Sequence, residues 1–308
     1  MKRITLGLVS ALAGIVSIPT TADAQQIAYG LNLTGQSFQT FDVTAPNNLS
    51  TATSITGLQA NETIVGIDFR PSNSTLYGYS NQNRLYRIGL NGAATFDTAF
   101  ATQATPAANG QGTDTPSPFP PSGNISIDVN PNVPTNGAVG ALRIVSDTAG
   151  NLRYAFSNST LNRDDTLSFA GNSAGGIIGV AYTNSDTDTT TGTALFYIRN
   201  DGNLYTTSAP NDGILTSVGS TGLTFSDTNV GFDIPLFDAD NTAYLSANDT
   251  LYTVNLGTGL ASAIGGIGGA GSEISDIAVV PEPSTNLLLL SGIGAAVFFV
   301  RRRRAQIS

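Results

Sequence analysis

Four aspartates are the residues of this sequence best suited to acid–base chemistry, because each lies in a short apolar run that recurs along the chain. They are Asp68, Asp128, Asp233 and Asp276. Paired carboxylates that face one channel can act as acid and base, as in glycoside hydrolysis. Carboxylates repeated in every unit can instead cap adjacent turns and fix the units by hydrogen bonds to backbone N–H groups. A catalytic pair usually breaks such symmetry, so we expect a structural role and assign no catalytic residue.

The composition removes most other kinds of catalysis. The chain has no His, Cys or Trp, and its only lysine is Lys2. Histidine-based acid–base chemistry, cysteine nucleophiles, zinc sites built on Cys or His and Schiff-base lysines are therefore excluded. We expect no cofactor.

The charge balance bears on the partners of the protein. Residues 25–280 contain seven arginines and twenty acidic residues, a net charge of −13. Because such a domain repels phosphate backbones, we expect no nucleic-acid partner.

Two glycine-rich motifs match known signatures without the context that those signatures need. Residues 171–175 fit G-x-S-x-G, but the nucleophile elbow requires a base and a strand-to-helix turn, and an apolar strand pattern follows instead. Residues 266–271 fit G-x-G-x-x-G, but no helix pattern follows to hold a pyrophosphate. We therefore assign no nucleophile to the first motif, and we interpret the second as a flexible turn between the fourth and fifth blades.

Two acidic clusters resemble parts of a calcium site. They are Asp186, Asp188 and Thr190 with Gly192, and Asp238 and Asp240 with Asn241. An EF-hand loop needs Gly at its sixth position and Glu at its twelfth, where this chain has Thr191 and Tyr197. An EF-hand is excluded, and a looser calcium site remains an alternative to solvated turn residues. We assign no metal ligand.

The elements that position these residues are short strands in a repeated unit. The first unit contains four alternating or apolar runs at 64–69, 75–79, 84–88 and 94–98, each bounded by Asn, Ser or Gly. The unit recurs loosely from Ile125, Ile178 and Val230, at the spacing typical of propeller blades. The sequence predicts an all-β domain, a β-propeller of four-stranded blades over residues 25–280.

The two ends of that domain are expected to share a blade. The lead-strand pattern at 274–280 has no partner strands downstream. Three predicted strands near the N-terminus have no lead strand of their own, and they lie at 27–31, 38–43 and 51–55. Pairing them closes the ring and removes exposed edges. We count five blades, with six or seven if long loops hide strands. The proline-rich stretch 104–123 is predicted to be an inserted loop, because proline cannot donate within a sheet.

The N-terminus has the layout of a secretory signal peptide. Lys2 and Arg3 precede an apolar run from Ile4 to Ile18, and small residues that include Ala22 and Ala24 precede Gln25. We predict that signal peptidase removes residues 1–24.

The C-terminus has the features of a second targeting segment. Pro281, Glu282 and Pro283 precede an apolar stretch at 287–300, which runs into the cluster Arg301, Arg302, Arg303 and Arg304. Arginines at one end of an apolar helix hold that end in the cytoplasm, so the preceding domain lies outside. Residues 281–308 thus predict a sorting segment with one transmembrane helix, the only part that enters the membrane.

This arrangement resembles the PEP-CTERM sorting signal of Gram-negative bacteria. The resemblance implies processing by an exosortase-type enzyme and export, by way of a transient inner-membrane anchor, to the cell surface or extracellular matrix of exopolysaccharide-producing bacteria. The repeated Gly-Ile-Asp and Gly-Phe-Asp runs, with Val145-Ser146-Asp147, are also similar to an uncharacterised secreted bacterial family of propeller type. That family implies no catalytic residues.

Three functions remain compatible with the sequence. The favoured one is a non-enzymatic surface or matrix protein associated with exopolysaccharide in a biofilm, with extracellular polysaccharide as the partner. The alternatives are a dedicated glycan-binding module and a carboxylate-based polysaccharide hydrolase or lyase.

Overall fold

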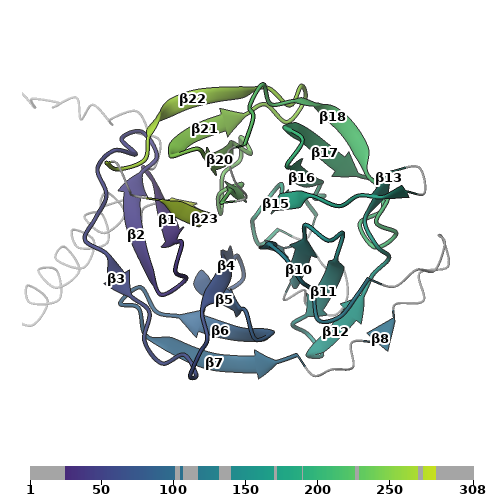
Figure 1. Cartoon of the computed structure of the whole chain (residues 1–308), viewed down its shortest axis with the longest axis horizontal. Helices are drawn as coiled ribbons and strands as arrows, with labels where there is room; N and C mark the ends of the chain where they lie inside the picture. Colours follow the sequence, from purple (N-terminus) through teal and green to yellow (C-terminus); the bar gives the residue numbers. More distant parts are fainter. Residues whose placement is uncertain are drawn as a thin grey trace, which may run out of the picture.

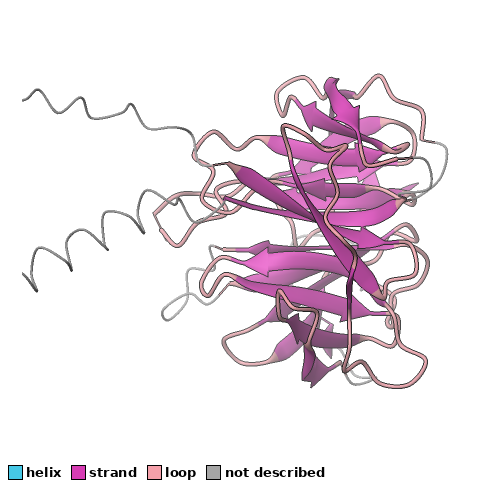
Figure 2. Cartoon of the chain, turned by 90° about the vertical axis from the view of Figure 1, so that its left-hand side faces the viewer, coloured by secondary structure: helices cyan, strands magenta, loops and turns pink. Residues whose placement is uncertain are grey.

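Short strands arranged around a central axis make up the regular structure of the protein (Figure 1). The computed structural model describes residues 25–100, 105–106, 117–131, 140–169, 172–188, 190–225, 229–269 and 273–281. Every regular element in these ranges is a strand, and Figure 2 shows the ring of sheets from the side. The fold is a β-propeller of five four-stranded blades, as the sequence predicts.

Four of the blades are antiparallel meanders of consecutive strands. Blade 1 contains β4 (Ile64–Arg70), β5 (Thr75–Ser80), β6 (Arg84–Ile88) and β7 (Ala94–Ala99). Blade 2 contains β9 (Ile125–Asn130), β10 (Ala141–Ser146), β11 (Asn151–Ala155) and β12 (Thr160–Arg163). Blade 3 contains β15 (Ile177–Tyr182), β16 (Leu195–Arg199), β17 (Asn203–Thr207) and β18 (Thr216–Ser220). Blade 4 contains β19 (Gly231–Asp233), β20 (Ala243–Ala247), β21 (Thr250–Val254) and β22 (Ala261–Gly266).

Blade 5 joins the two ends of the domain, in the strand order β23-β1-β2-β3. Its strands are β23 (Ile274–Pro281), β1 (Gln26–Asn32), β2 (Ser37–Asp42) and β3 (Thr53–Ser54). The register runs from Gln26 opposite Pro281 to Asn32 opposite Ile274. The predicted closure is confirmed. It pairs the first and last strands of the domain with each other, and without this pairing both would have an exposed edge.

The lead strands β4, β9, β15, β19 and β23 lie innermost, and their burial explains their composition. All six residues of β15 are buried, whereas the outer strand β18 has only exposed and half-buried residues. A strand covered on both faces has a nearly continuous apolar sequence. Glycine allows the close approach: a Cβ on Gly231 would lie 2.4 Å from the Ile277 nitrogen in the next blade.

The hydrophobic core is divided among the interfaces between blades. Five clusters of buried side chains occur among the described residues, and each draws on two neighbouring blades. One cluster, for example, joins Leu85 of blade 1 to Leu142 and Leu152 of blade 2. Each blade is therefore stabilised by two neighbours, and an incomplete ring would leave two apolar faces uncovered.

The structure adds short elements that the pattern did not reveal. β12 completes blade 2 as its fourth strand, and β8 (Thr105–Pro106) pairs with β12 in parallel. The stretch at 104–123 is thus not wholly a loop, and its Pro106 lies in β8, the edge strand of the sheet, where a missing N–H is tolerated. β13 (Ser168–Phe169) and β14 (Asn172–Ser173) form a small separate hairpin.

The predicted signal peptide and the predicted transmembrane segment lie outside the described residues. Within those residues, no helix is long and apolar enough to cross a bilayer. Of the residues assigned to processing, only Pro281 is described, and it ends β23.

Candidate functional site

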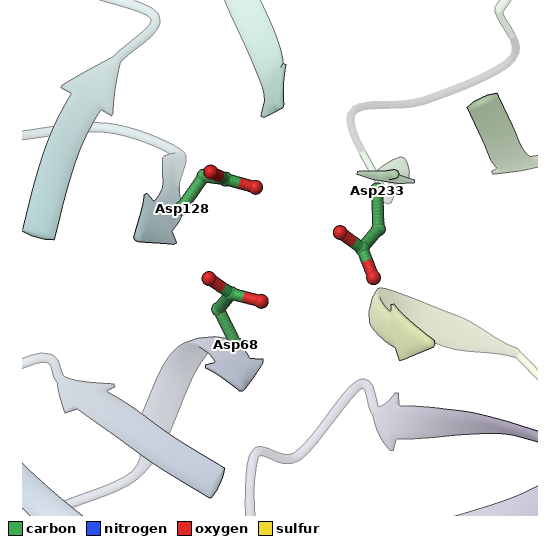
Figure 3. A group of neighbouring side chains, drawn as sticks. All are labelled: Asp68, Asp128 and Asp233. Atoms are coloured by element: carbon green, nitrogen blue, oxygen red, sulfur yellow. The ribbon is translucent and has the colours of Figure 1, made fainter. Parts of the chain in front are cut away.

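Three of the four recurrent aspartates meet at the centre of the propeller. β4, β9 and β19 supply Asp68, Asp128 and Asp233, and one carboxylate oxygen of each lies within 4.8 Å of the others (Figure 3). Their exposed fractions are 7%, 5% and 4%. Three blades that are remote in sequence thus converge on one buried acidic cluster.

These carboxylates accept hydrogen bonds from the backbone of the next blade. The Val129 N–H donates to Asp68 Oδ2 at 2.6 Å, and the Tyr182 N–H donates to Asp128 Oδ1 at 3.2 Å. The Val279 N–H donates to Asp233 Oδ2 at 2.5 Å. The expected backbone pairing is present, but the donors belong to neighbouring lead strands and not to turns.

The fourth aspartate occupies a different level of the channel. Asp276 Oδ2 accepts the N–H of Ile67, the residue before Asp68, at 2.8 Å. Asp68 instead accepts the N–H of Val129, the residue after Asp128. Side chains on one face of a strand recur every second residue. Asp276 therefore lies two residues before the position in its strand that corresponds to that of the other three aspartates. Ser126 matches that level in blade 2, where its hydroxyl accepts the Val180 N–H at 3.1 Å. The aspartates therefore do not repeat at one equivalent place in every blade.

Blade 3 departs from the pattern, since Ala181 stands where Asp68 stands in blade 1. Its junction with blade 4 is held farther out, by the side chain of Asn241. Asn241 Oδ1 accepts the Asn184 N–H at 2.5 Å, and Asn241 Nδ2 donates to Asn184 Oδ1 at 2.9 Å. The Phe237 N–H also donates to the Ser185 carbonyl at 2.8 Å.

Burial raises the pKa of all four aspartates. It raises the pKa of Asp233 to about 7, although N–H donors from Val279 and Ile234 oppose the shift. Burial and then the charge of Asp233 raise the pKa of Asp68 well above its usual range. Burial raises the pKa of Asp128 and of Asp276 in the same direction. The cluster consequently holds protons at pH values where exposed carboxylates are ionised.

Backbone N–H groups already occupy part of the oxygen set of the cluster. Three carboxylates supply part of the six to eight oxygens of a Ca²⁺ site, and several of these oxygens already accept backbone N–H groups. Because the three carboxyl groups lie so close together, each one affects the ionisation of the others.

One cavity among the described residues lies at the starts of the lead strands. It has a volume of about 160 Å³ and is lined by residues at the starts of lead strands, including Ile64, Ile125 and Ser275. Small-molecule sites usually have volumes of about 300–1,000 Å³. None of the four aspartates lines this cavity.

The two acidic clusters proposed as loose calcium sites are hydrogen-bonded turns. Asp186 Oδ1 accepts the Asp188 N–H at 2.7 Å, and Asp188 Oδ1 accepts the Thr190 N–H at 2.9 Å. The carboxylate of Asp238 accepts the N–H groups of Asp240 and Thr242, at 3.0 and 2.8 Å. These contacts are typical of aspartates that stabilise turns.

The two glycine-rich motifs lie in the contexts that the sequence indicates. Ser173 is an exposed residue of β14, and β15 follows it, so the strand-to-helix elbow is absent from this described stretch. The second motif begins at the end of β22, and β23 is the next element. Neither motif contributes to a site; Gly171, Ala270 and Gly271 lie outside the described residues.

Sequence reasoning missed a buried polar network in blade 2. Arg143 is only 2% exposed, and its guanidinium donates to Asp164, Asn151 and Asn211 at 2.7, 2.8 and 3.0 Å. Arg153 also pairs with Asp164, at 3.1 Å. The one available signal was an arginine in the middle of an apolar run, Leu142-Arg143-Ile144.

Comparison with known proteins identifies two segments of the chain. The model of Domain of unknown function (DUF4394) matches residues 37–278, and that of the PEP-CTERM protein-sorting motif matches residues 279–304. The second match covers the proline and arginine residues assigned to sorting. No curated protein matches the chain.

Two solved structures are similar at low sequence identity. A structural genomics protein of unknown function from Bacteroides thetaiotaomicron has a TM-score of 0.41 and 14% identity, over 78% of this chain and 50% of that one. The chain therefore spans about half the length of that protein. A chain of a nidogen/laminin complex has a TM-score of 0.46 and 10% identity, over 83% of this chain and 98% of that one.

Proposed function

We propose that this chain, which belongs to the DUF4394 family, is a non-enzymatic protein of the cell surface or extracellular matrix that associates with exopolysaccharide. The PEP-CTERM motif makes it an exported protein that is sorted by exosortase. The polysaccharide partner and the absence of catalysis are the parts that we add.

The hydrogen bonds of the central carboxylates support a non-enzymatic role. Asp68, Asp128, Asp233 and Asp276 each accept a backbone N–H from the next blade, and each is at most 7% exposed. A general acid or base has to reach the proton that it transfers in a bound substrate. Carboxylates that hold blades together suit a scaffold better than an active site, and none of the four lines the cavity of about 160 Å³ at the starts of the lead strands.

One observation favours the hydrolase alternative. The three-aspartate cluster brings carboxylate oxygens within 4.8 Å of one another, near the separation of about 5–5.5 Å between the carboxyl groups of retaining glycosidases. This alternative requires the propeller centre to open to a sugar chain.

We further propose that the mature chain runs from near Gln25 to near Pro283, after transient anchoring by the C-terminal segment. The intact mass of protein isolated from an exosortase-positive host measures both ends. A mature protein that still carries Arg301 to Arg304 would contradict this processing.

Sedimentation with polysaccharide tests the proposed function. Purified residues 25–283 should sediment with the extracellular polysaccharide of the producing bacterium more than an unrelated acidic protein does. They should release no reducing sugar over time. Chain shortening that disappears in the Asp68→Asn, Asp128→Asn or Asp233→Asn variant would replace the proposal by the hydrolase alternative.

A further inference from the structure

A groove of about 460 Å³ lies where blades 4 and 5 meet, and none of the four lead-strand aspartates lines it. Its walls are the start of β1, the residues after β2, the loop from β19 to β20 and the end of β23. Its volume falls within the range of about 300–1,000 Å³ that is usual for small-molecule sites. Phe237, Ala239 and Asp240 on its wall are exposed, so the groove opens at the surface.

An aromatic ring is presented at this groove by an unusual backbone. Phe237 has a φ of 57° and an exposed fraction of 51%. A bulky residue in the left-handed region is an outlier, and such residues concentrate at functional sites. Its neighbour Leu236 is buried in the cluster between blades 5 and 1, so the loop turns one apolar side chain inward and the next outward.

Contacts on both sides hold Phe237 in this conformation. The Phe237 N–H donates to the Ser185 carbonyl of blade 3 at 2.8 Å, and the Leu236 N–H donates to the Val279 carbonyl of blade 5 at 3.3 Å. The backbone that carries the ring is thus fixed before any ligand arrives, which lowers the entropy lost on binding.

Uncharged polar groups lie around the aromatic ring. The Tyr244 hydroxyl donates to Gln26 Oε1 at 2.6 Å, which leaves the phenol oxygen as an acceptor and the Gln26 amide N–H groups as donors. Thr44 and Thr242 add two hydroxyl groups to the lining. Burial raises the pKa of Tyr244 to about 12, so the phenol stays protonated at neutral pH.

The charge of the lining limits the kind of ligand. Among the described residues that line the groove, Asp238 and Asp240 are charged and none is an arginine or a lysine. A polymer of uronic acids, or one that bears sulfate or phosphate, would be repelled by these carboxylates. An uncharged pyranose fits, because its C–H face can pack on the ring while its hydroxyl groups exchange hydrogen bonds with amides, hydroxyls and carboxylates.

We propose that this groove, lined by Phe237, Tyr244, Gln26 and Asp238, binds uncharged sugar units of an extracellular polysaccharide. The assignment rests on the proposed function and adds its binding site and the charge class of its ligand. Phe237 is the stacking platform, and the Tyr244 and Gln26 pair selects hydroxyl groups.

Co-sedimentation of residues 25–283 with two probes tests the site. The probes are the extracellular polysaccharide of the producing bacterium and the same polymer after chemical reduction of its carboxyl groups. Wild-type protein should bind the reduced polymer at least as tightly as the native one. The Phe237→Gly variant should lose up to about ten-fold in affinity, which is the size of one lost aromatic contact.

Matched variants separate a loss of binding from a loss of folding. Phe237→Gly removes the left-handed strain, so its melting temperature should equal or exceed that of the wild type. Phe96→Ala removes another half-exposed phenylalanine, in β7, and should bind as the wild type does. Tyr244→Phe should weaken binding several-fold through the lost hydroxyl.

The outcomes distinguish this site from the proposed function. Wild-type protein that sediments with neither probe refutes both. If wild type and Phe237→Gly bind equally, the groove is not the site, while polysaccharide association stands. Binding that weakens when the carboxyl groups are reduced overturns the assignment to uncharged sugars.

Discussion

The central aspartates should make the protein more stable in weak acid than at pH 8. Burial raises the pKa of Asp233 to about 7, against a usual value of 3.8. Between these two pH values the folded state holds a proton that the unfolded state has released. The folded state therefore binds more protons, and the free energy of unfolding falls as the pH rises. Most proteins rich in carboxylates show the opposite trend below about pH 5.

The size of the effect follows from the shift at Asp233 alone. One pKa unit corresponds to about 1.4 kcal/mol, so raising the pH from 5 to 8 should cost about 3 kcal/mol of folding stability. Asp68, Asp128 and Asp276 have pKa values raised in the same direction and add to this loss. The chain has no histidine, so only the terminal amino group otherwise titrates here with its usual pKa.

A carboxylate with the opposite shift does not mask the trend. Burial opposes ionisation of Glu62, but hydrogen bonds from Tyr86, Ser80 and Arg84 outweigh it and lower the pKa of that carboxyl. A lowered pKa contributes stability that is complete above the unfolded value of 4.5 and is lost as the pH falls through the folded value. That loss lies below about pH 5.

Urea unfolding of residues 25–283 at pH 5, 6, 7 and 8 measures the effect, at constant ionic strength and with a chelator present. The free energy of unfolding should decrease across the series, and the decrease should shrink in the Asp233→Asn variant. The exposed control Asp240→Asn should keep the wild-type slope. A free energy that stays constant or increases from pH 5 to pH 8 would refute the reasoning.

Three further predictions concern stability. Gly231→Ala should lower the free energy of unfolding by about 1–3 kcal/mol, because its Cβ would meet the backbone of β23 at 2.4 Å. The control Gly192→Ala has nothing within 4 Å of its Cβ and should change that free energy by less than about 0.5 kcal/mol. Melting temperatures compare the two variants. Arg143→Met should lower the free energy of unfolding measured in urea by about 3–5 kcal/mol, because it removes a partner of the fully buried Asp164. The control Arg87→Met breaks an exposed pair with Asp97 and should lower that free energy by about 1 kcal/mol or less. Deleting residues 25–58 should expose β23 and cause aggregation, and a monomeric product with an unchanged melting temperature would contradict ring closure.

The blade pattern could be predicted from the sequence because each strand is a local feature. Alternation and apolar runs bounded by turn residues located all four strands of blade 1, at 64–69, 75–79, 84–88 and 94–98. Closure was also predictable, since an unpartnered lead strand at one end and orphan strands at the other leave one arrangement without open edges. β12 was missed, because Thr160–Arg163 has little apolar alternation and forms only as the outer strand of a sheet already built.

The sequence by itself determined that this protein is an exported propeller whose two ends share a blade. Both conclusions depend on local order along the chain: strand periodicity, and the succession of Pro-Glu-Pro, apolar segment and arginines that the sorting-motif match covers. Tertiary structure alone decided what the side chains do. Asp68 and Val129 are 61 positions apart, and their hydrogen bond depends on how two lead strands are set against each other. Phe237 likewise faces a groove only because contacts from blades 3 and 5 fix its backbone, and no local pattern encodes such contacts.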